Sequence, residues 1–247
     1  MTSPPPAQVG AGRPPRVFVQ RRKAVADEIK AYILREQLRP GDPLPTENEL
    51  CAAIGASRSS VREAVQTLAA LDIVEVRHGY GTYVGRMSLA ALVQSLAFRG
   101  LLSSEDDRKV LEDLVDVRQM LEVGLASAIT EGMAGPLRSD LEAVVSRMDR
   151  RAKAGEQFFA EDREFHLLLV QPAVNDLVVQ LTGAFWDIHS IVAPRRDPGR
   201  AELRRTAQAH SAIVEAAVTG DVLQLTNAIR MHYEPIRARI RQVLERR

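Results

Sequence analysis

Hydrophobic residues recur at helical spacing near the start of the chain. In residues 24–38, Val25, Ile29, Ile33 and Leu38 fall close to one face of a helix. The next residues, RPGDPLP, end this helix because proline and glycine do not continue one. The pattern therefore predicts a first helix that stops before a turn.

Two further helices are predicted after this turn. Thr46 and Glu49 have the spacing of a capping box, and the short helix that they begin ends at Gly55. Ser57 is a favoured N-cap residue for a third helix, which runs to about Leu71. The apolar face of this third helix consists of Val61, Val65, Leu68 and Leu71, and its polar positions include Arg58, Ser59, Arg62 and Gln66.

The pattern then changes from helical spacing to two short β-branched runs. The runs IVEVR and TYV flank the sequence HGYG, in which Gly79 and Gly81 favour a tight turn. These runs predict a β-hairpin directly after the third helix. Three helices followed by a hairpin are the elements of a winged helix-turn-helix, in which the hairpin is the wing.

No strand pattern follows residue 105, and all later segments have helical spacing. Glycine and proline separate these segments, and Pro235 falls inside the last one, where it is expected to kink the helix. The predicted fold class is mainly α: an N-terminal winged helix-turn-helix with a small β-hairpin, and a C-terminal all-helical bundle. The helices of the bundle are predicted at residues 106–132, 136–154, 156–170, 173–193, 201–219 and 222–246.

Composition indicates the limits of the domains and the cellular compartment of the protein. Residues 1–16 are rich in proline and glycine, which predicts a disordered tail. A DNA-binding domain is predicted at residues 17–86, a partly helical linker at 87–104, and the bundle at 105–247. The chain has a single cysteine and no apolar run as long as a membrane span, and its N-terminus lacks the apolar core of a signal peptide. These features predict a cytoplasmic protein.

Net charge by itself indicates little about the partners of the chain, because it is only +1. Residues 1–86 contain 12 Lys/Arg and 9 Asp/Glu, whereas the remainder contains 21 and 23. This asymmetry gives weak support to nucleic-acid binding by the N-terminal part. The positions of the charged residues are more informative than their number.

The second helix of a helix-turn-helix pair enters the major groove of DNA with its N-terminus first. An arginine fork there can pair with guanine, while serine hydroxyls and glycine-rich turns suit the sugar-phosphate backbone. The alternative is an arginine-bearing helix face that is merely solvated. The candidate DNA contacts are Ser57, Arg58, Ser59 and Arg62 on the helix, and His78, Gly79 and Tyr80 on the wing.

A second group of candidate residues lies in the helical half. Asp162 and His166 are four residues apart and therefore share one helix face, and His210 and His232 lie on the two helices predicted last. One carboxylate and three imidazoles suit a divalent Zn, Ni, Mn or Fe ion. The alternative is that these histidines are ordinary core or surface groups.

The N-terminal part resembles the DNA-binding domain of the GntR family of bacterial transcription regulators. The resemblance covers residues 24–85 and depends on GDPLPTE, SRSSVREA and HGYGTYV. It implies DNA contacts at Ser57, Arg58, Ser59, Arg62 and Gly79. One position departs from the family pattern, because Asn48 stands where an arginine is frequent.

From about Asp107 the chain resembles the all-helical effector domain of the FadR-like subfamily, called FCD. The resemblance depends on VDVRQMLEVGLASAI, DREFHLLLV, AHSAIVEAAVTGD and AIRMHYEPI. It implies a divalent metal held by Asp162, His166, His210 and His232. It also implies that Arg118 pairs with a carboxylate ligand, for which the alternative is an ion pair with Glu122.

Two further residues are candidates for the same ligand site. Asn175 is expected to orient a ligand or a metal-binding group, and His189 to line the cavity, with a surface or packing role as the alternative for His189.

These inferences together predict a ligand-responsive transcription regulator. It is expected to bind double-stranded operator DNA as a homodimer, to sense a small carboxylic acid at a metal site, and to act as a repressor. Two alternatives stay open: a metal-dependent enzyme that acts on small acids, and a DNA-binding dimer that senses nothing.

Overall fold

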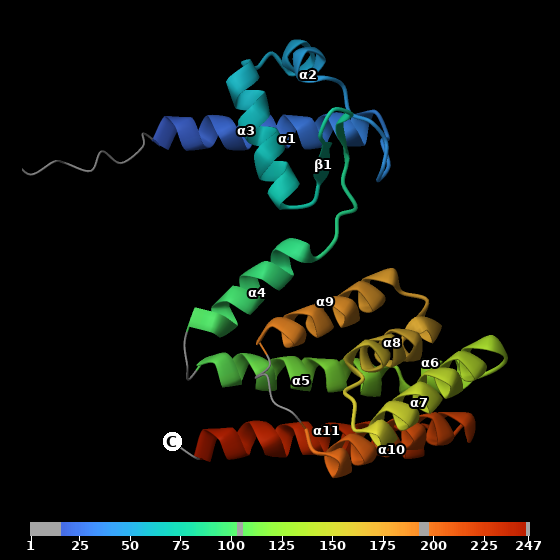
Figure 1. Cartoon of the computed structure of the whole chain (residues 1–247). Coiled ribbons are helices and arrows are strands. Elements are labelled where there is room, and N and C mark those ends of the chain that lie inside the picture. Colours follow the sequence, from blue (N-terminus) through green and yellow to red (C-terminus); the bar gives the residue numbers. More distant parts are fainter. Residues whose placement is uncertain (1–15, 103–105, 193–197, 246–247) are drawn as a thin grey trace, which may run out of the picture. The chain divides into compact units, whose positions relative to one another are not determined.

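A computed structural model describes residues 16–102, 106–192 and 198–245 of the chain. The predicted disordered tail lies outside these ranges, apart from Arg16. The chain forms two compact units, and the boundary between them falls between Ser88 and Leu89 (Figure 1). No helix among the described residues is long and apolar enough to cross a bilayer.

The first unit has three helices followed by a hairpin, in the predicted order. Helix α1 begins earlier than expected, because the arginine-rich sequence before residue 24 has no apolar periodicity that would predict it. The core joins Ile29 of the first helix, Leu50 of the second and Leu68 of the third. The elements are α1 (Arg16–Arg35), α2 (Glu47–Ile54), α3 (Arg58–Ala70), β1 (Val74–Arg77) and β2 (Gly81–Val84).

The caps expected from the sequence begin both helices of the pair. The Glu49 backbone N–H donates to Thr46 Oγ1 at 3.4 Å, and the Thr46 N–H donates to Glu49 Oε2 at 2.8 Å. The Ser60 N–H donates to Ser57 Oγ at 3.3 Å. Leu71 is the exception to the predicted apolar face, since it lies at the end of α3 and is 50% exposed.

The hairpin is antiparallel, with Val74 opposite Val84 and Arg77 opposite Gly81. Gly79 and Gly81 have φ angles of 80° and 107°, which confirms that the turn uses the left-handed backbone conformation open to glycine. The segment before α2 pairs with the outer edge of β2, because the Leu44 N–H donates to the Thr82 carbonyl at 2.8 Å. This pairing ties the wing to the turn between α1 and α2.

The second unit is all-helical within its described residues. Helix α4 occupies most of the segment for which a linker is predicted, and it packs on α5 and α9. The long predicted helix at residues 106–132 is divided at Leu125 into two helices. The elements are α4 (Ala90–Leu102), α5 (Asp106–Gly124), α6 (Ala126–Gly132), α7 (Pro136–Ala154), α8 (Phe159–Leu169), the 3-10 turn η1 (Gln171–Ala173), α9 (Asp176–Val192), α10 (Arg200–Val218) and α11 (Val222–Glu245).

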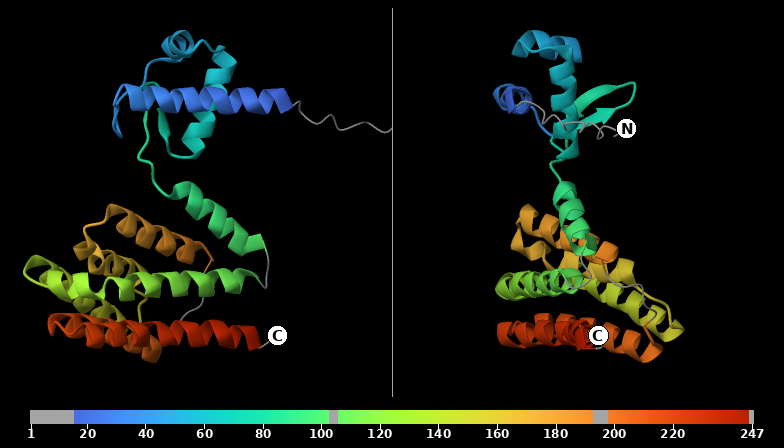
Figure 2. Two further views of the ribbon diagram at one scale, coloured as in Figure 1. Left: turned by 180° about the vertical axis from the view of Figure 1, so that it is seen from behind. Right: turned by 90° about the vertical axis from the view of Figure 1, so that its left-hand side faces the viewer.

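The centre of this bundle is lined by α5, α8, α10 and α11. Both views in Figure 2 show α5 beside α11, and α10 packs on α7 and α11. Pro235 lies within α11, which continues beyond it to Glu245. The inward faces of these four helices carry most polar residues of the candidate site among large apolar ones such as Phe165, and α9 adds His189. The fold class is therefore the predicted one.

Candidate functional site

The predicted DNA contacts lie on the surface of the first unit, at the start of α3 and at the tip of the hairpin. The hydroxyl of Ser57 caps α3 and lies 3.0 Å from the Ser59 hydroxyl, so these two serines also organise the helix start. Tyr80 at the wing tip is 81% exposed. All seven predicted residues are exposed: Ser57, Arg58, Ser59, Arg62, His78, Gly79 and Tyr80.

Arg62 is paired with a carboxylate of the neighbouring helix. Its Nε and Nη2 donate to Glu47 Oε1 and Oε2 at 3.2 and 3.0 Å, which is a two-point ion pair between α3 and α2. The hydrogen bond from Arg62 lowers the pKa of Glu47, so the carboxylate is ionised at neutral pH. The pair leaves Nη1 of Arg62 for other acceptors.

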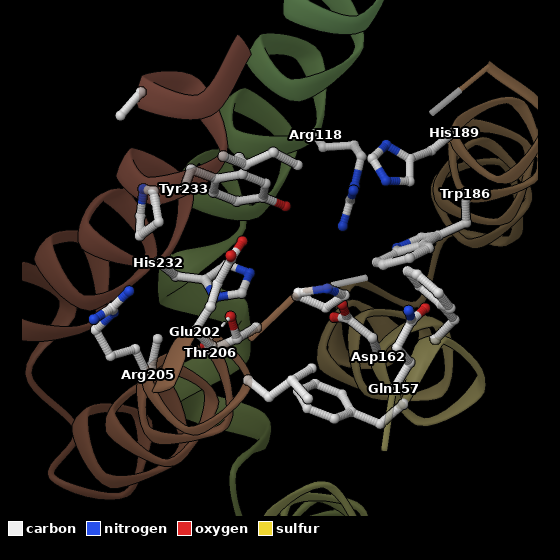
Figure 3. A pocket seen from close by; sticks show the side chains of 18 residues that line it. Arg118, Gln157, Asp162, Trp186, His189, Glu202, Arg205, Thr206, His232 and Tyr233 are labelled. Carbon is white, nitrogen blue, oxygen red and sulfur yellow. Dashed lines mark hydrogen bonds between the residues drawn. The ribbon is translucent and has the colours of Figure 1, made fainter. Parts of the chain in front are cut away.

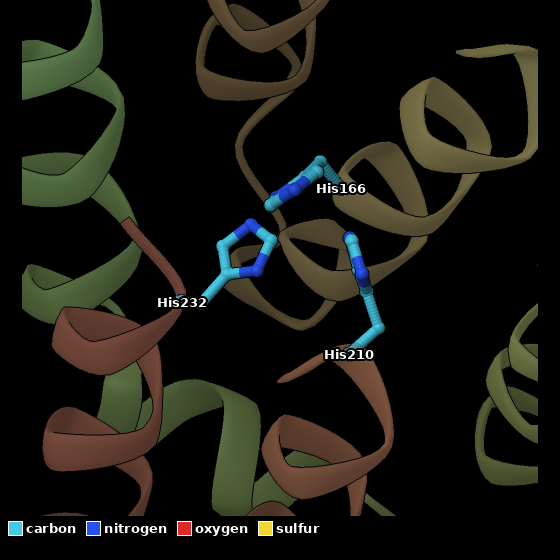
Figure 4. Close-up of side chains that lie close together, drawn as sticks. All are labelled: His166, His210 and His232. Carbon is cyan, nitrogen blue, oxygen red and sulfur yellow. The ribbon is translucent and has the colours of Figure 1, made fainter. Parts of the chain in front are cut away.

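Three histidines of the second unit converge at the centre of the bundle. His166 of α8, His210 of α10 and His232 of α11 each bring one ring nitrogen within 4.8 Å of the others. Figure 4 shows the three rings pointing toward one another from different helices. His166 and His210 are fully buried. Because the helices come from distant parts of the sequence, the fold itself creates this cluster.

Asp162 lies beside two of the three histidines. Its Oδ1 is 2.8 Å from His210 Nε2 and 3.4 Å from His166 Nε2. The three predicted histidine ligands are therefore brought together, and the Asp162 carboxylate adjoins the cluster on the side of His166 and His210.

Two of the histidines are oriented by hydrogen bonds at their other ring nitrogen. His210 Nδ1 lies 2.8 Å from the Thr206 carbonyl oxygen, to which it must donate. His166 Nδ1 lies 2.6 Å from Glu122 Oε1. In both rings Nε2 is then the atom that faces the cluster, which is the arrangement that histidine ligands of metals have in proteins.

The environment favours an ionised aspartate and a neutral third histidine. Burial opposes the charge of Asp162, but His210 and His166 outweigh burial and hold its pKa well below the ordinary value. Burial, together with His210 and His166, lowers the pKa of His232 well below its ordinary value. His232 Nδ1 is buried without a hydrogen-bond partner among the described residues. A carboxylate and three imidazole rings are ligand types that suit a divalent cation.

A cavity of about 310 Å³ opens beside the cluster. Its lining includes Asp162 and His232, so the cavity reaches the predicted metal ligands. Arg118, Trp186 and His189 form another part of the wall, as Figure 3 shows. A small molecule in this cavity would touch both the arginine and the ligand cluster.

Arg118 is a buried cation without an ion-paired carboxylate in the described part of the chain. It is 4% exposed, and its guanidinium carbon lies 4.1 Å from the ring centroid of Trp186 and 5.5 Å from that of Tyr233. The alternative ion pair with Glu122 does not form, because that carboxylate contacts His166 and Tyr233. Burial of an unpaired charge is costly, so an anionic ligand is the natural partner of Arg118.

The other two predicted ligand residues differ in their placement. His189 lines the cavity, with its ring centroid 5.7 Å from that of Trp186. Asn175 does not line it: the side chain is exposed, and its Oδ1 accepts from the Leu177 and Val178 N–H groups at 3.1 and 3.3 Å. Asn175 therefore caps the start of α9, because a short polar side chain before a helix satisfies its free N–H groups.

Sequence reasoning did not assign Glu122, Tyr233 or Thr206 to the site. In the sequence Glu122 stands out only as a possible partner of Arg118, four residues before it, and a tyrosine or a backbone carbonyl has no characteristic spacing that marks a site. The Tyr233 hydroxyl donates to Glu122 Oε1 at 2.9 Å, which links residues 111 positions apart. Only the packing of α5 against α11 reveals this contact.

Comparison with known proteins agrees with this division into two units. Residues 21–84 match the family of bacterial regulatory proteins called gntR, and residues 113–235 match the FCD domain. The transcriptional regulator LutR of Bacillus subtilis is 33% identical over 145 residues, which span 59% of this chain and 64% of LutR, slightly less than two thirds of its length.

Two other relatives cover more of the chain. The transcriptional repressor NanR of Cronobacter sakazakii is 28% identical over 91% of this chain and 87% of its own. The solved structure of a GntR protein from Streptococcus agalactiae is 27% identical, covers 88% of this chain and 99% of its own, and superimposes with a TM-score of 0.65. The named relatives are regulators of transcription. The chain therefore belongs to the gntR family of bacterial regulatory proteins, with an FCD domain after the DNA-binding domain, and is a transcription regulator rather than an enzyme.

Proposed function

We propose that this protein is a cytoplasmic repressor that binds operator DNA as a homodimer and releases the DNA when a small carboxylic acid binds beside a divalent metal. One observation carries this proposal. Arg118, a buried arginine without an ion-paired carboxylate among the residues that the structure describes, lines a cavity that also reaches the ligand cluster through Asp162 and His232. A cation on one wall and a potential metal site on another favour an anion between them.

The ligands of the proposed metal are Asp162, His166, His210 and His232. The residue types suit Zn, Ni, Mn or Fe and do not choose among them. When bound, the ion would supply a positive centre that accepts an oxygen atom of the acid. Arg118 would hold the carboxylate from the opposite side, and His189 would line the same space.

On the DNA side, the start of α3 would enter the major groove. Arg58 and Arg62 would read base edges, and Ser57 and Ser59 would contact phosphates. Gly79 allows the wing backbone to approach the sugar-phosphate surface, with His78 and Tyr80 on either side of it. A twofold dimer would match a pseudo-palindromic operator.

The acid can regulate DNA binding only if it prefers one arrangement of the dimer over the other. A coupling of this kind typically changes affinity about 5- to 150-fold. Relatives of the chain are named both repressors and activators, and the choice of repression follows NanR, which is named a repressor and covers the larger share of this chain.

A screen of carboxylic acids tests the proposal. The purified full-length chain, loaded with Zn²⁺ or Mn²⁺, is mixed with labelled DNA from the region flanking its own gene. Fluorescence anisotropy then measures the affinity in the presence of simple mono-, di- and hydroxycarboxylic acids. We expect at least one acid to weaken DNA binding about 5-fold or more, and the same acid to raise the thermal midpoint of the protein.

The same screen distinguishes the alternative of a DNA-binding dimer that senses nothing. If the protein binds neither Zn²⁺ nor Mn²⁺, and no acid changes the thermal midpoint or the DNA affinity, the proposed sensing function is wrong. If an acid weakens DNA binding equally with and without metal, the proposed metal site is wrong and the proposed acid sensing still holds.

A further inference from the structure

Glu122 is the most completely buried carboxylate of the site and joins three helices. It is 1% exposed on α5, its Oε1 lies 2.6 Å from His166 Nδ1 of α8, and the Tyr233 hydroxyl of α11 donates to the same oxygen at 2.9 Å. A carboxylate would not be buried without a gain from these partners, because removing its charge from water is costly. The contacts therefore indicate a specific role.

The contact with Glu122 defines which nitrogen of His166 carries the hydrogen. The Tyr233 hydroxyl donates to Oε1, so this oxygen is an acceptor and His166 Nδ1 must be the donor. His166 Nε2 is buried, makes no hydrogen bond among the described residues, and lies 3.4 Å from Asp162 Oδ1. Nε2 is thus the atom on the Asp162 side of the ring, and Figure 4 shows the His166 ring turned toward the rings of His210 and His232.

We propose that Glu122 is a positioning residue for the metal site, and that it sets the affinity of the site for its cation through His166. This inference rests on the proposed function, because it requires that the cluster binds a metal. A negatively charged acceptor both orients the imidazole and makes it a stronger electron donor, whereas the neutral Thr206 carbonyl at His210 mainly orients the ring. His232 Nδ1 has no hydrogen-bond partner in the part of the chain that the structure describes.

A purely structural role is the competing explanation. Arg118 is one helical turn before Glu122. Burial raises the pKa of the Glu122 carboxyl, His166 lowers it, and the charge of Arg118 lowers it further. Glu122 could in that case serve only to offset the charge of the arginine. The two explanations differ in what they predict for the hydrogen on the His166 ring and for the metal affinity.

The test uses Glu122→Gln, which keeps the size of the side chain and removes its charge. The affinity of the metal-free full-length protein for Zn²⁺ is measured by competition with a chelator, and we expect it to fall about 10- to 100-fold. Nitrogen-15 NMR of the histidine rings in the metal-free protein should show His166 protonated at Nδ1 in the wild type and a mixture of ring forms in the variant. The matched control is Glu112→Gln on the same helix, which should change neither measurement.

Tyr233→Phe is a second variant that keeps the carboxylate and removes only one of its hydrogen bonds. It should lower the Zn²⁺ affinity less than Glu122→Gln does, and it provides the answer if the first variant does not fold. Zn²⁺ affinities equal to that of the wild type in the folded variants would overturn the role of Glu122. Failure of the wild-type protein to bind Zn²⁺ would instead refute the metal site itself.

Discussion

Each of the two candidate sites contains a carboxylate paired with a nitrogen-bearing side chain. One of these pairs is exposed to solvent, and the other is buried. In the first unit the side chains of Arg62 and Glu47 are 64% and 41% exposed. In the second unit the side chains of His166 and Glu122 are 0% and 2% exposed. The exposed pair can exchange its partners with water and salt, whereas the buried pair has no solvent to replace a lost partner.

The difference in exposure matches the two kinds of ligand, which are DNA at the first site and a metal ion with a small acid at the second. DNA is a large polyanion that meets a surface, so arginines that read it must stay accessible and are able to leave a weak ion pair. A metal ion and a small acid must be enclosed, so their ligands have to be held in place before binding. Substitutions at the buried site should therefore cost more binding than a substitution at the exposed pair.

Loss of a metal ligand should have the largest effect. His210→Ala removes one ligand and leaves Asp162 without its 2.8 Å partner. We expect the affinity for Zn²⁺ to fall by more than about 100-fold and the acid response to disappear, while DNA binding in the absence of acid is retained. Elemental analysis and anisotropy measure both properties. Unchanged metal content would remove His210 from the site.

Replacement of the buried arginine should have the next largest effect. Arg118→Met retains an unbranched side chain in the cavity wall and removes the charge, so the affinity for the acid found in the screen should fall about 10- to 100-fold, as expected for lost hydrogen bonds between charged groups. Metal content should not change. Calorimetry with the acid measures the loss.

Arg150→Met is the matched control for this substitution, since Arg150 is an exposed arginine on α7. It should bind the acid like the wild type. Equal losses in the two variants would show that general charge, rather than the cavity arginine, attracts the acid.

The DNA-reading arginine should act mainly on specificity. Arg58→Ala should cost about 1–3 kcal/mol of discrimination between operator and unrelated DNA. Lys30→Ala on α1 is a control that should lower both affinities equally or leave both unchanged. Competition binding with the two DNAs at one salt concentration measures the ratio. A parallel loss of both affinities in Arg58→Ala would mean that this residue contacts only phosphate.

The smallest effect is expected at the exposed pair. Glu47→Gln frees Arg62 and removes a negative charge close to the proposed DNA surface, so affinity for unrelated DNA should stay equal or rise, by less than about threefold. The thermal midpoint should hardly change. A large loss of stability in this variant would show that the exposed pair holds α2 and α3 together, and that its exposure does not make it weak.

The local elements of both units could be predicted well from the sequence. The capping box of Thr46 and Glu49, the N-cap at Ser57 and the glycine turn of the wing all depend on residues within four positions of one another. The shared face of Asp162 and His166 is likewise a property of helix spacing. Local rules of this kind act before any long-range contact forms, so they can be recognised in a single chain.

Other features of the site depend on packing between distant segments. Glu122 meets His166 across 44 residues and Tyr233 across 111, and no periodicity marks such contacts. Asn175 shows the opposite case, because its residue type suits a ligand site although its position makes it a helix cap. Helix caps, turns and shared faces follow from neighbouring residues, whereas the partners of a buried charge are chosen by the packing of helices around it.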